Sequence, residues 1–324
     1  MSIFIRQSMK KRICLMGNRL LATGVLAYLH SRPEVALLVV LNPSDEGVDS
    51  DAGASLKAAV QIANVPWIQP RHVKEAEAQQ CIRDFSPDLI LSCSYEKIVP
   101  VEVINIPKDG ALNIHYAALP LNRGCLPVVW SIALGSDELA VTLHEMTPGI
   151  DDGPILGQRK LLMTEGLTAG EGYHLCAQEA VKMVTEFLDG YLSAGEYKAV
   201  PQDSSQATYH AMVYPYDRWI PWHRPAVEVA RIINALTYVP HPSGRTLNRG
   251  TGQEIGLLGP TYAIVESTLQ PGEIVLNDTG AQIGTAAGEV NIVSGRVGDR
   301  PVPISQVLTG VPFVSSYLRD IYSK

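Results

Sequence analysis

The chain of 324 residues has no excess of basic residues, no long apolar run and no paired-cysteine motif. Its 26 Lys and Arg stand against 33 Asp and Glu, and the net charge of -7 excludes a global electrostatic attraction to nucleic acid or to an anionic membrane. No apolar segment reaches the ~18 residues of a membrane span, and the first twelve residues lack an apolar core followed by a small-residue cleavage site. We therefore expect a soluble, cytoplasmic protein with no membrane partner.

Motifs for a metal, a disulfide framework and a dinucleotide are also missing. The five cysteines are an odd number without a C-x-x-C pair, so we expect reduced, mostly buried thiols and no metal. The first strand-to-helix turn reads MGNRLLATG and lacks the G-x-G-x-x-G pattern that lets the backbone close on a pyrophosphate. Binding of NAD is therefore not expected.

The length and the 46% content of hydrophobic residues predict a sizeable core and two domains. Short apolar runs alternate with helical patterns over the first part of the chain, which is the β-α-β rhythm of a parallel sheet. We predict an α/β domain with a Rossmann-like, open, parallel-rich sheet. Its strands are expected at residues 12–17, 35–41, 65–69, 87–94, 110–115 and 139–146.

The pattern changes after a long amphipathic helix predicted over residues 167–196. Residues 197–210 are polar and contain proline, so we interpret them as a linker. Beyond them, one helix and several short apolar runs at regular spacing predict a small barrel or sandwich. We place an α/β catalytic domain at residues 1–200 and a smaller, β-rich, barrel-like (OB-like) domain at residues 201–324, which could also form a homodimer interface.

Chemistry is concentrated in two stretches. Asn113 and His115 in NIHYAALPLNRG are two residues apart, so on a strand they share one face, at the carboxyl end where open α/β sheets place ligands. Asp151 and Asp152 lie in the glycine-flanked loop TPGIDDGPIL. An amide that donates to an oxyanion, an imidazole that moves a proton and a carboxylate that orients it form a set for acyl transfer. The alternatives are a structural hydrogen-bonded pair and a simple turn.

The remaining polar residues give weaker signals. No serine or cysteine stands in an obvious nucleophile motif, so direct attack by a bound amine is more natural than a covalent acyl-enzyme. The other histidines that we considered show no ligand spacing and are expected to be structural: His144, His174, His210, His223 and His241.

In the order N-x-H, L-P-x-x-R-G and G-x-D-x-G, these motifs resemble the formyltransferase family over most of residues 12–192. The later segments ATYH, DRWIPW and PGEIV also look like the smaller barrel-like domain of methionyl-tRNA formyltransferases and sugar N-formyltransferases. The resemblance implies a formyltransferase fold and N10-formyltetrahydrofolate as the formyl donor. It departs from the family's S-L-L-P at Ala117 and Ala118, so any hydrogen bond made by that serine is absent.

The resemblance also implies roles for individual residues. Asn113 would hold the formyl oxygen, His115 would transfer a proton, and Asp151 rather than Asp152 would keep the imidazole or a water in place. The folate would lie against the residues after the preceding strand and against the aspartate loop, which here are Ser94, Tyr95, Glu96, Lys97, Ile98, Thr147, Gly149 and Ile150. The motif that follows the histidine would contact the substrate through Leu119, Pro120, Arg123 and Gly124.

The acceptor is predicted from a second departure. Methionyl-tRNA formyltransferases carry a basic insertion after the second strand, whereas residues 42–55 here contain Asp45, Glu46, Asp49 and Asp51 and no Lys or Arg. Four carboxylates facing phosphates would repel them, so we do not expect nucleic acid as a partner. We predict a small amine, most naturally the amino group of a nucleotide-linked sugar. The alternatives are a methionyl-tRNA formyltransferase, a formyltetrahydrofolate hydrolase and an inactive module that binds folate or a nucleotide.

Overall fold

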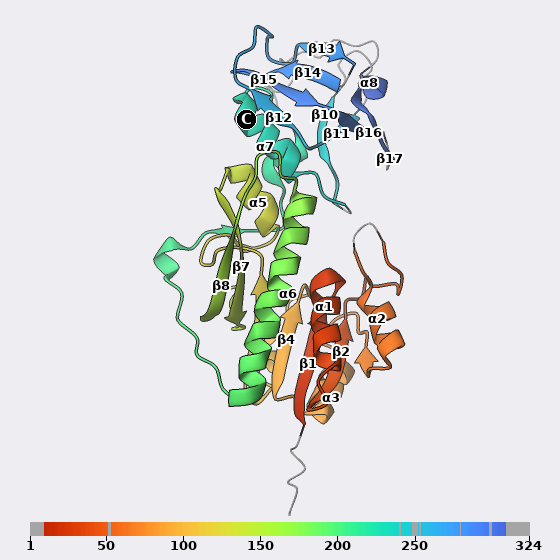
Figure 1. Cartoon of the computed structure of the whole chain (residues 1–324), viewed down its shortest axis with the longest axis vertical. Helices are drawn as coiled ribbons and strands as arrows, with labels where there is room; N and C mark the ends of the chain where they lie inside the picture. Colours follow the sequence, from red (N-terminus) through yellow and green to blue (C-terminus); the bar gives the residue numbers. More distant parts are fainter. Residues whose placement is uncertain are drawn as a thin grey trace, which may run out of the picture. The chain divides into compact units, whose positions relative to one another are not determined.

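The computed structural model describes residues 10–50, 53–239, 241–247, 252, 254–278, 280–297 and 300–308 (Figure 1). The chain forms two compact units that are interleaved along the sequence. The first contains residues 1–123, 140–160 and 174–209, and the second contains residues 124–139, 161–173 and 210–324. Two segments from the first 200 residues thus belong to the same unit as the C-terminal part. The single domain boundary at residue 200 stays a prediction.

A seven-stranded sheet in the order β3-β2-β1-β4-β5-β7-β8 organises the first 200 residues. Strands β1 to β5 pair in parallel, as predicted, whereas β7 runs antiparallel to β5. The elements of this part are β1 Lys11–Gly17, α1 Arg19–His30, β2 Val35–Leu41, α2 Leu56–Ala63, β3 Trp67–Ile68, α3 Ala76–Phe85, β4 Leu89–Cys93, α4 Val101–Ile104, β5 Ala111–His115, β6 Arg123–Gly124, α5 Pro127–Leu134, β7 Glu138–Glu145, β8 Ile155–Leu162 and α6 Ala169–Ala194.

Strands β1 and β4 are buried on both faces, which explains why their sequences are continuous apolar runs. On one face, Cys14 and Met16 of β1 join a core cluster with Ile82 of α3 and Val103 of α4. Helices α1 and α6 lie over the sheet in Figure 1, and they approach so closely that a Cβ on Gly24 would lie 2.7 Å from Val181.

Local signals begin and end the helices. The Ser55 side chain caps α2 by accepting from the backbone N–H of Ala58, and Asn64 ends that helix in the left-handed conformation. Helix α5 begins with Pro127 and ends at Gly135, whose φ is 73°. Among the described residues, no helix is both long and apolar enough to cross a membrane.

The C-terminal part is β-rich, as predicted, with two four-stranded sheets in the orders β10-β11-β16-β17 and β12-β15-β14-β13. Trp222 and residues of α7 fill its core together with Ile255, Leu257 and Ile283. Its elements are η1 Ser204–Gln206, β9 Tyr209–His210, η2 Pro215–Arg218, α7 Ala226–Ala235, β10 Gly244–Leu247, β11 Glu254–Leu258, β12 Tyr262–Ile264, β13 Ile274–Asn277, β14 Gly280–Gly284, β15 Glu289–Ile292, β16 Ser294–Val297, β17 Arg300–Pro303 and α8 Ile304–Val307.

Residues 197–210 are more than the linker that we predicted. Val200 exchanges two backbone hydrogen bonds with Ile155 at the start of β8, and the Tyr197 hydroxyl donates to the Asp109 carbonyl. The segment ends in β9, which pairs with β6. Its polar composition therefore reflects side chains and backbone groups that bond to the rest of the chain.

Candidate active site

Strands β5 and β7 bring an amide and an imidazole together. Asn113 and His144 are direct partners in the antiparallel register, and the Asn113 Nδ2 lies 3.1 Å from the His144 Nε2. The His144 Nδ1 lies 2.8 Å from the Glu145 carbonyl oxygen, which can only accept. The proton of His144 is therefore on Nδ1, and its Nε2 accepts from the Asn113 amide.

His115 lies two residues along β5 on the same face and is almost fully buried. Its Nε2 lies 2.8 Å from the Asn122 carbonyl oxygen, so this nitrogen donates and carries the proton of the neutral ring. The basic nitrogen is then Nδ1, which lies 3.6 Å from the Asp151 Oδ2. The unprotonated nitrogen of the neutral ring thus faces a carboxylate, which favours the protonated form of the imidazole.

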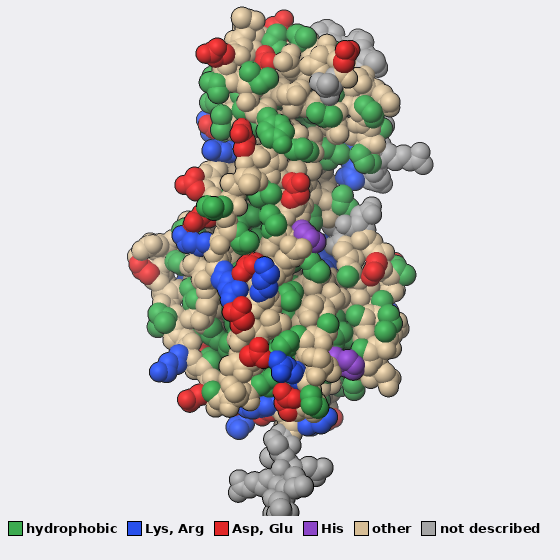
Figure 2. Space-filling model, viewed as in Figure 1, with side chains coloured by type: hydrophobic (Ala, Val, Ile, Leu, Met, Phe, Trp, Pro, Cys, Tyr) green, Lys and Arg blue, Asp and Glu red, His purple; other side chains and the backbone are tan. Residues whose placement is uncertain are grey.

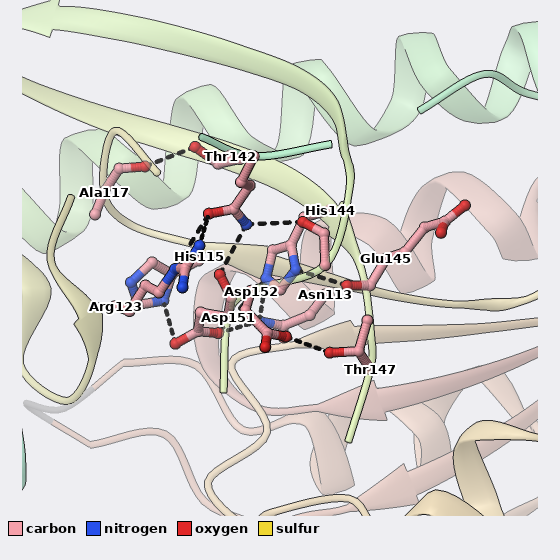
Figure 3. A network of polar contacts seen from close by, with 12 residues as sticks. Asn113, His115, Ala117, Arg123, Thr142, His144, Glu145, Thr147, Asp151 and Asp152 are labelled. Atoms are coloured by element: carbon pink, nitrogen blue, oxygen red, sulfur yellow. Dashed lines mark hydrogen bonds and ion pairs between the residues drawn. The ribbon is translucent and has the colours of Figure 1, made fainter. Parts of the chain in front are cut away.

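The loop between β7 and β8 supplies Asp151. Its Oδ1 lies 3.4 Å from the Asn113 Nδ2 and 3.5 Å from the His144 Nε2 (Figure 3). Asp152 is exposed and turned away, and accepts a hydrogen bond from the Thr147 hydroxyl. Of the two aspartates, it is Asp151 that lies among Asn113, His115 and His144.

Burial is the main influence on the pKa of His115, which it lowers below the usual value. The Asp151 carboxylate and the Asn122 carbonyl raise the pKa and partly offset this effect, and His144 lowers it further. The imidazole is therefore neutral at neutral pH and able to accept a proton.

This lowered pKa predicts a pH-dependent contribution to stability. The unfolded chain binds a proton at His115 near pH 6.5, whereas the folded chain resists it, so stability should fall as the pH drops from about 6.5 through the lower pKa of the folded state. In urea unfolding at pH 7.5 and pH 5, His115→Gln should lose less stability on acidification than the wild type. The exposed His174, changed to Gln, is the matched control and should behave as the wild type does. Equal acid losses in the wild type and His115→Gln would contradict the prediction.

Three of the five cysteines are poor candidates for a nucleophile. All five are free thiols, and burial raises the pKa of Cys14, Cys93 and Cys176, that of Cys176 to about 12. Such thiols are poor nucleophiles because the thiolate is the reactive form. Within the residues that the structure describes, no group of three or more His, Cys, Asp or Glu is arranged to hold a metal ion.

The predicted folate segments have mixed surroundings. The Ser94 hydroxyl lies 3.2 Å from that of Tyr116, whereas Tyr95 packs against the buried cluster that contains Cys14. The Glu96 backbone N–H donates to Asn42, and Lys97 and Ile98 are exposed. In the aspartate loop, Gly149 leaves room for Asp152, because a Cβ at this position would lie 2.0 Å from the Asp152 Oδ2, and Ile150 is exposed. The two segments thus each present an exposed isoleucine.

Several groups of the predicted substrate loop already form hydrogen bonds with other parts of the chain. Leu119 is buried, and its carbonyl accepts from Gln158. The Pro120 carbonyl accepts from the Thr208 backbone N–H. Two nitrogens of Arg123 donate to the Gln202 side chain, at 3.2 and 2.8 Å, and Gly124 lies in β6. A role in substrate binding stays a prediction for these four residues.

The acidic stretch after β2 is less exposed than predicted. Asp45 is buried, and its carboxylate accepts from the Ser55 hydroxyl at 2.6 Å and from the backbone N–H groups of Gly47 and Lys57. Asp49 accepts from the Ser55 N–H, while Glu46 is exposed and Asp51 lies outside the described residues. Asp45 therefore orders this loop, and the picture of four carboxylates facing a ligand was wrong.

His144 was expected to be structural, and the structure places it beside Asn113 and Asp151. Its position opposite Asn113 depends on the pairing of β5 with β7, which no local pattern reveals. A signal was present, however: Thr142 and His144 repeat, within a buried strand, the spacing of Asn113 and His115. Of the other histidines that were expected to be structural, three have partners outside this cluster and one is exposed: His174 contacts Gln178, His210 contacts Trp130, His241 contacts Tyr214, and His223 is exposed.

The ends of the central strands thus hold an amide, two imidazoles and a carboxylate, which are groups that can donate hydrogen bonds and transfer protons. Residues 12–188 match the family model described as formyl transferase, and residues 212–312 match that of the formyl transferase C-terminal domain. The chain belongs to the formyltransferase family and is an N-formyltransferase.

Several known proteins are similar to the chain. The methionyl-tRNA formyltransferase of Herpetosiphon aurantiacus is 30% identical over 300 residues, which cover 90% of this chain and 95% of that protein. That of Pseudomonas fluorescens is 32% identical over 272 residues, 82% of each chain. Among solved structures, an N-formyltransferase from Helicobacter canadensis in complex with folinic acid and dTDP-3-aminofucose has a TM-score of 0.69 at 20% identity, covering 87% of this chain and 98% of that one. The sugar 3N-formyltransferase WlaRD, solved with dTDP and 5-N-formyl-THF, has a TM-score of 0.67 at 19% identity, with 88% and 97% covered.

Proposed function

We propose that the chain transfers the formyl group of N10-formyltetrahydrofolate to the amino group of a nucleotide-linked sugar. The observation that supports the transfer step is the cluster of Asn113, His115 and Asp151, in which the Asp151 carboxylate lies 3.4 Å from the Asn113 amide and 3.6 Å from the neutral imidazole of His115. The folate donor is supported by the named ligands of the solved relatives.

The three groups divide the work of the reaction. The acceptor amine forms a bond to the formyl carbon and loses a proton, which the His115 Nδ1 takes because its Nε2 is held by the Asn122 carbonyl. Asp151 stabilises the imidazolium that results. Asn113 donates an N–H to the negative charge that develops on the formyl oxygen. The bond from the formyl carbon to N10 of the folate then breaks, and the proton held by His115 returns to N10.

Asn113 must exchange one contact to do this. Both of its amide N–H groups are engaged, one with His144 at 3.1 Å and one with Asp151 at 3.4 Å. The contact with Asp151 is at the long end for a hydrogen bond, so it is the one that we expect to be replaced by the formyl oxygen. His144 keeps the amide oriented throughout.

We propose that the two predicted folate segments bind the ring system of the donor. Ile98 and Ile150 expose apolar side chains that an aromatic ring could cover. N10-formyltetrahydrofolate supplies the activated formyl group. These segments would hold it, which leaves the catalytic side chains to act on the formyl carbon.

The acceptor is the finer part of the proposal. The amino sugar is supported by the ligands named for the solved relatives and by the absence of Lys and Arg from residues 42–55. Over α6, charges of both signs are interspersed, with Arg159 bonded to Glu179 and Glu186, and Figure 2 shows this mixture on the face that it draws. A phosphate backbone favours continuous positive surface over such a mixture.

The second candidate is a methionyl-tRNA formyltransferase. It is favoured by the names of the sequence relatives and by the inward position of Asp45, which removes one of the charges that would repel a tRNA. Both candidates use the same three catalytic groups, so they differ only in the partner that delivers the amine.

An acceptor panel separates the candidates. Tetrahydrofolate release from N10-formyltetrahydrofolate is measured with dTDP-linked amino sugars, with charged initiator methionyl-tRNA and with water alone, and the reaction without enzyme serves as the blank. We expect turnover with an amino sugar only. Turnover with the tRNA would replace the proposed acceptor, turnover with water alone would indicate a hydrolase, and no turnover with any acceptor would contradict formyl transfer to either one.

A further inference from the structure

Gln202 joins the two loops that carry the site motifs. Its Nε2 lies 2.8 Å from the Asp151 carbonyl oxygen and 2.7 Å from that of Gly153, so both of its N–H groups donate to the aspartate loop. Its Oε1 accepts from Nε and Nη2 of Arg123 at 3.2 and 2.8 Å. The Gln202 side chain thus donates both N–H groups to the aspartate loop and accepts from Arg123 in the loop that follows His115.

We propose that Gln202 is a positioning residue for formyl transfer, which holds Asp151 at His115 by clamping the backbone of the aspartate loop to Arg123. The proposal deepens the proposed function and rests on it for the catalytic roles of Asp151 and His115. Gln202 itself touches backbone carbonyls and a guanidinium, and it acts through them.

The backbone of Asp151 explains why a clamp is needed. Its φ of 52° lies in the left-handed region, which is costly for a residue with a side chain and persists when surrounding contacts hold it. The two carbonyls that Gln202 binds belong to this residue and to Gly153, so the clamp spans the strained position. Without it, the loop can relax and carry the carboxylate away from the imidazole.

Gln202 is itself held at both sides. Val200 pairs with Ile155 through backbone bonds of 2.7 and 2.8 Å. Thr208 receives the Arg123 backbone N–H at 2.9 Å, and its hydroxyl receives the Asn122 N–H at 2.7 Å. Because the Asn122 carbonyl binds the His115 Nε2, the same segment supports both partners of the imidazole.

The pKa of His115 reports the position of the loop. The groups that influence it are the Asp151 carboxylate, which raises it, and His144, which lowers it, in addition to burial and the Asn122 carbonyl. If Asp151 moves away, the contribution that raises the pKa is lost, and the pKa of His115 falls further. This readout does not need any substrate.

The test compares Gln202→Met with the wild type. Methionine keeps the length of the side chain without a donor, a strong acceptor or a charge. The His115 imidazole is followed by NMR against pH, with its resonance assigned from its loss in His115→Gln, and kcat is measured with the acceptor found in the panel. Gln206→Ala is the matched control, because Gln206 is an exposed glutamine of the same segment whose side chain bonds to Asp203.

We expect the pKa of His115 to fall in Gln202→Met and kcat to fall about 10- to 100-fold, the cost of a catalytic group displaced by about 1 Å. Gln206→Ala should change neither quantity. Thermal unfolding identifies a misfolded variant, in which case Gln202→Asn, with a reach shorter by one methylene, replaces it. An unchanged or raised pKa of His115 in the folded variant would overturn the proposal, even if the wild type transfers the formyl group. A wild type without turnover would contradict only the proposed function.

Discussion

Replacing His115 with glutamine is expected to lower kcat for formyl transfer by about 10²- to 10⁴-fold, the usual contribution of a general base. Glutamine can still donate an N–H to the Asn122 carbonyl, so the loop that this bond supports should remain in place. What is lost is the basic Nδ1 that faces Asp151 at 3.6 Å. The measurement is single-turnover formation of the formylated acceptor at pH 7.5, which reports the chemical step.

The exposed His174, changed to glutamine, controls for the loss of an imidazole elsewhere in the same unit. Its kcat should match that of the wild type. If His115→Gln retained more than a tenth of the wild-type rate while remaining folded, the proton would have to leave by another route, and the assignment of His115 as the base would fail.

Replacing Asn113 with alanine is expected to lower kcat by about 10²- to 10³-fold, the cost of one lost donor to an oxyanion. The affinity for the folate should change little, because the predicted folate segments lie on other parts of the chain. Asn113→Asp also lacks the N–H groups and adds a negative charge beside Asp151 and the developing oxyanion, so its loss should be at least as large. Equilibrium binding of tetrahydrofolate is measured alongside kcat.

Asn105, an exposed asparagine at the end of α4, is the matched control when changed to alanine. We expect wild-type turnover from it. Near-normal turnover in Asn113→Ala would show that the formyl oxygen is stabilised by other donors, such as backbone N–H groups, and would remove Asn113 from the mechanism.

The parts of the fold that depend on short sequence segments could be predicted. The apolar runs of β1, β2 and β4 are buried on both faces, and their alternation with helical patterns defines a parallel sheet. The direction of β7 could not be predicted, because an apolar strand reads the same in either direction and its partner is set by tertiary packing. Strand β10 was missed within a stretch rich in Gly, Pro and Asn, where turn signals outweigh a four-residue strand.

The site shows the same division. The pairing of Asn113 with His115 follows from the period of two along a single strand, which the sequence displays directly. His144 and Gln202 reach the site from distant parts of the chain, 31 and 89 residues beyond Asn113, through strand pairing and side-chain reach. The prediction that Asp45 faces a ligand was wrong, because the sequence does not distinguish an aspartate that accepts hydrogen bonds within a loop from one that faces solvent.

The interleaving of the two units has a consequence for building chimeras of this enzyme with its relatives. Helix α5 packs against α7, with Gly135 lying against Arg231 and Ala133 against the C-terminal core. A crossover at residue 200 would give α5 a foreign neighbour while keeping its own sequence. Recombination that also exchanges residues 124–139 and 161–173 would transfer each packing surface with its natural partner, so the crossover points are better chosen by contact than by position along the chain.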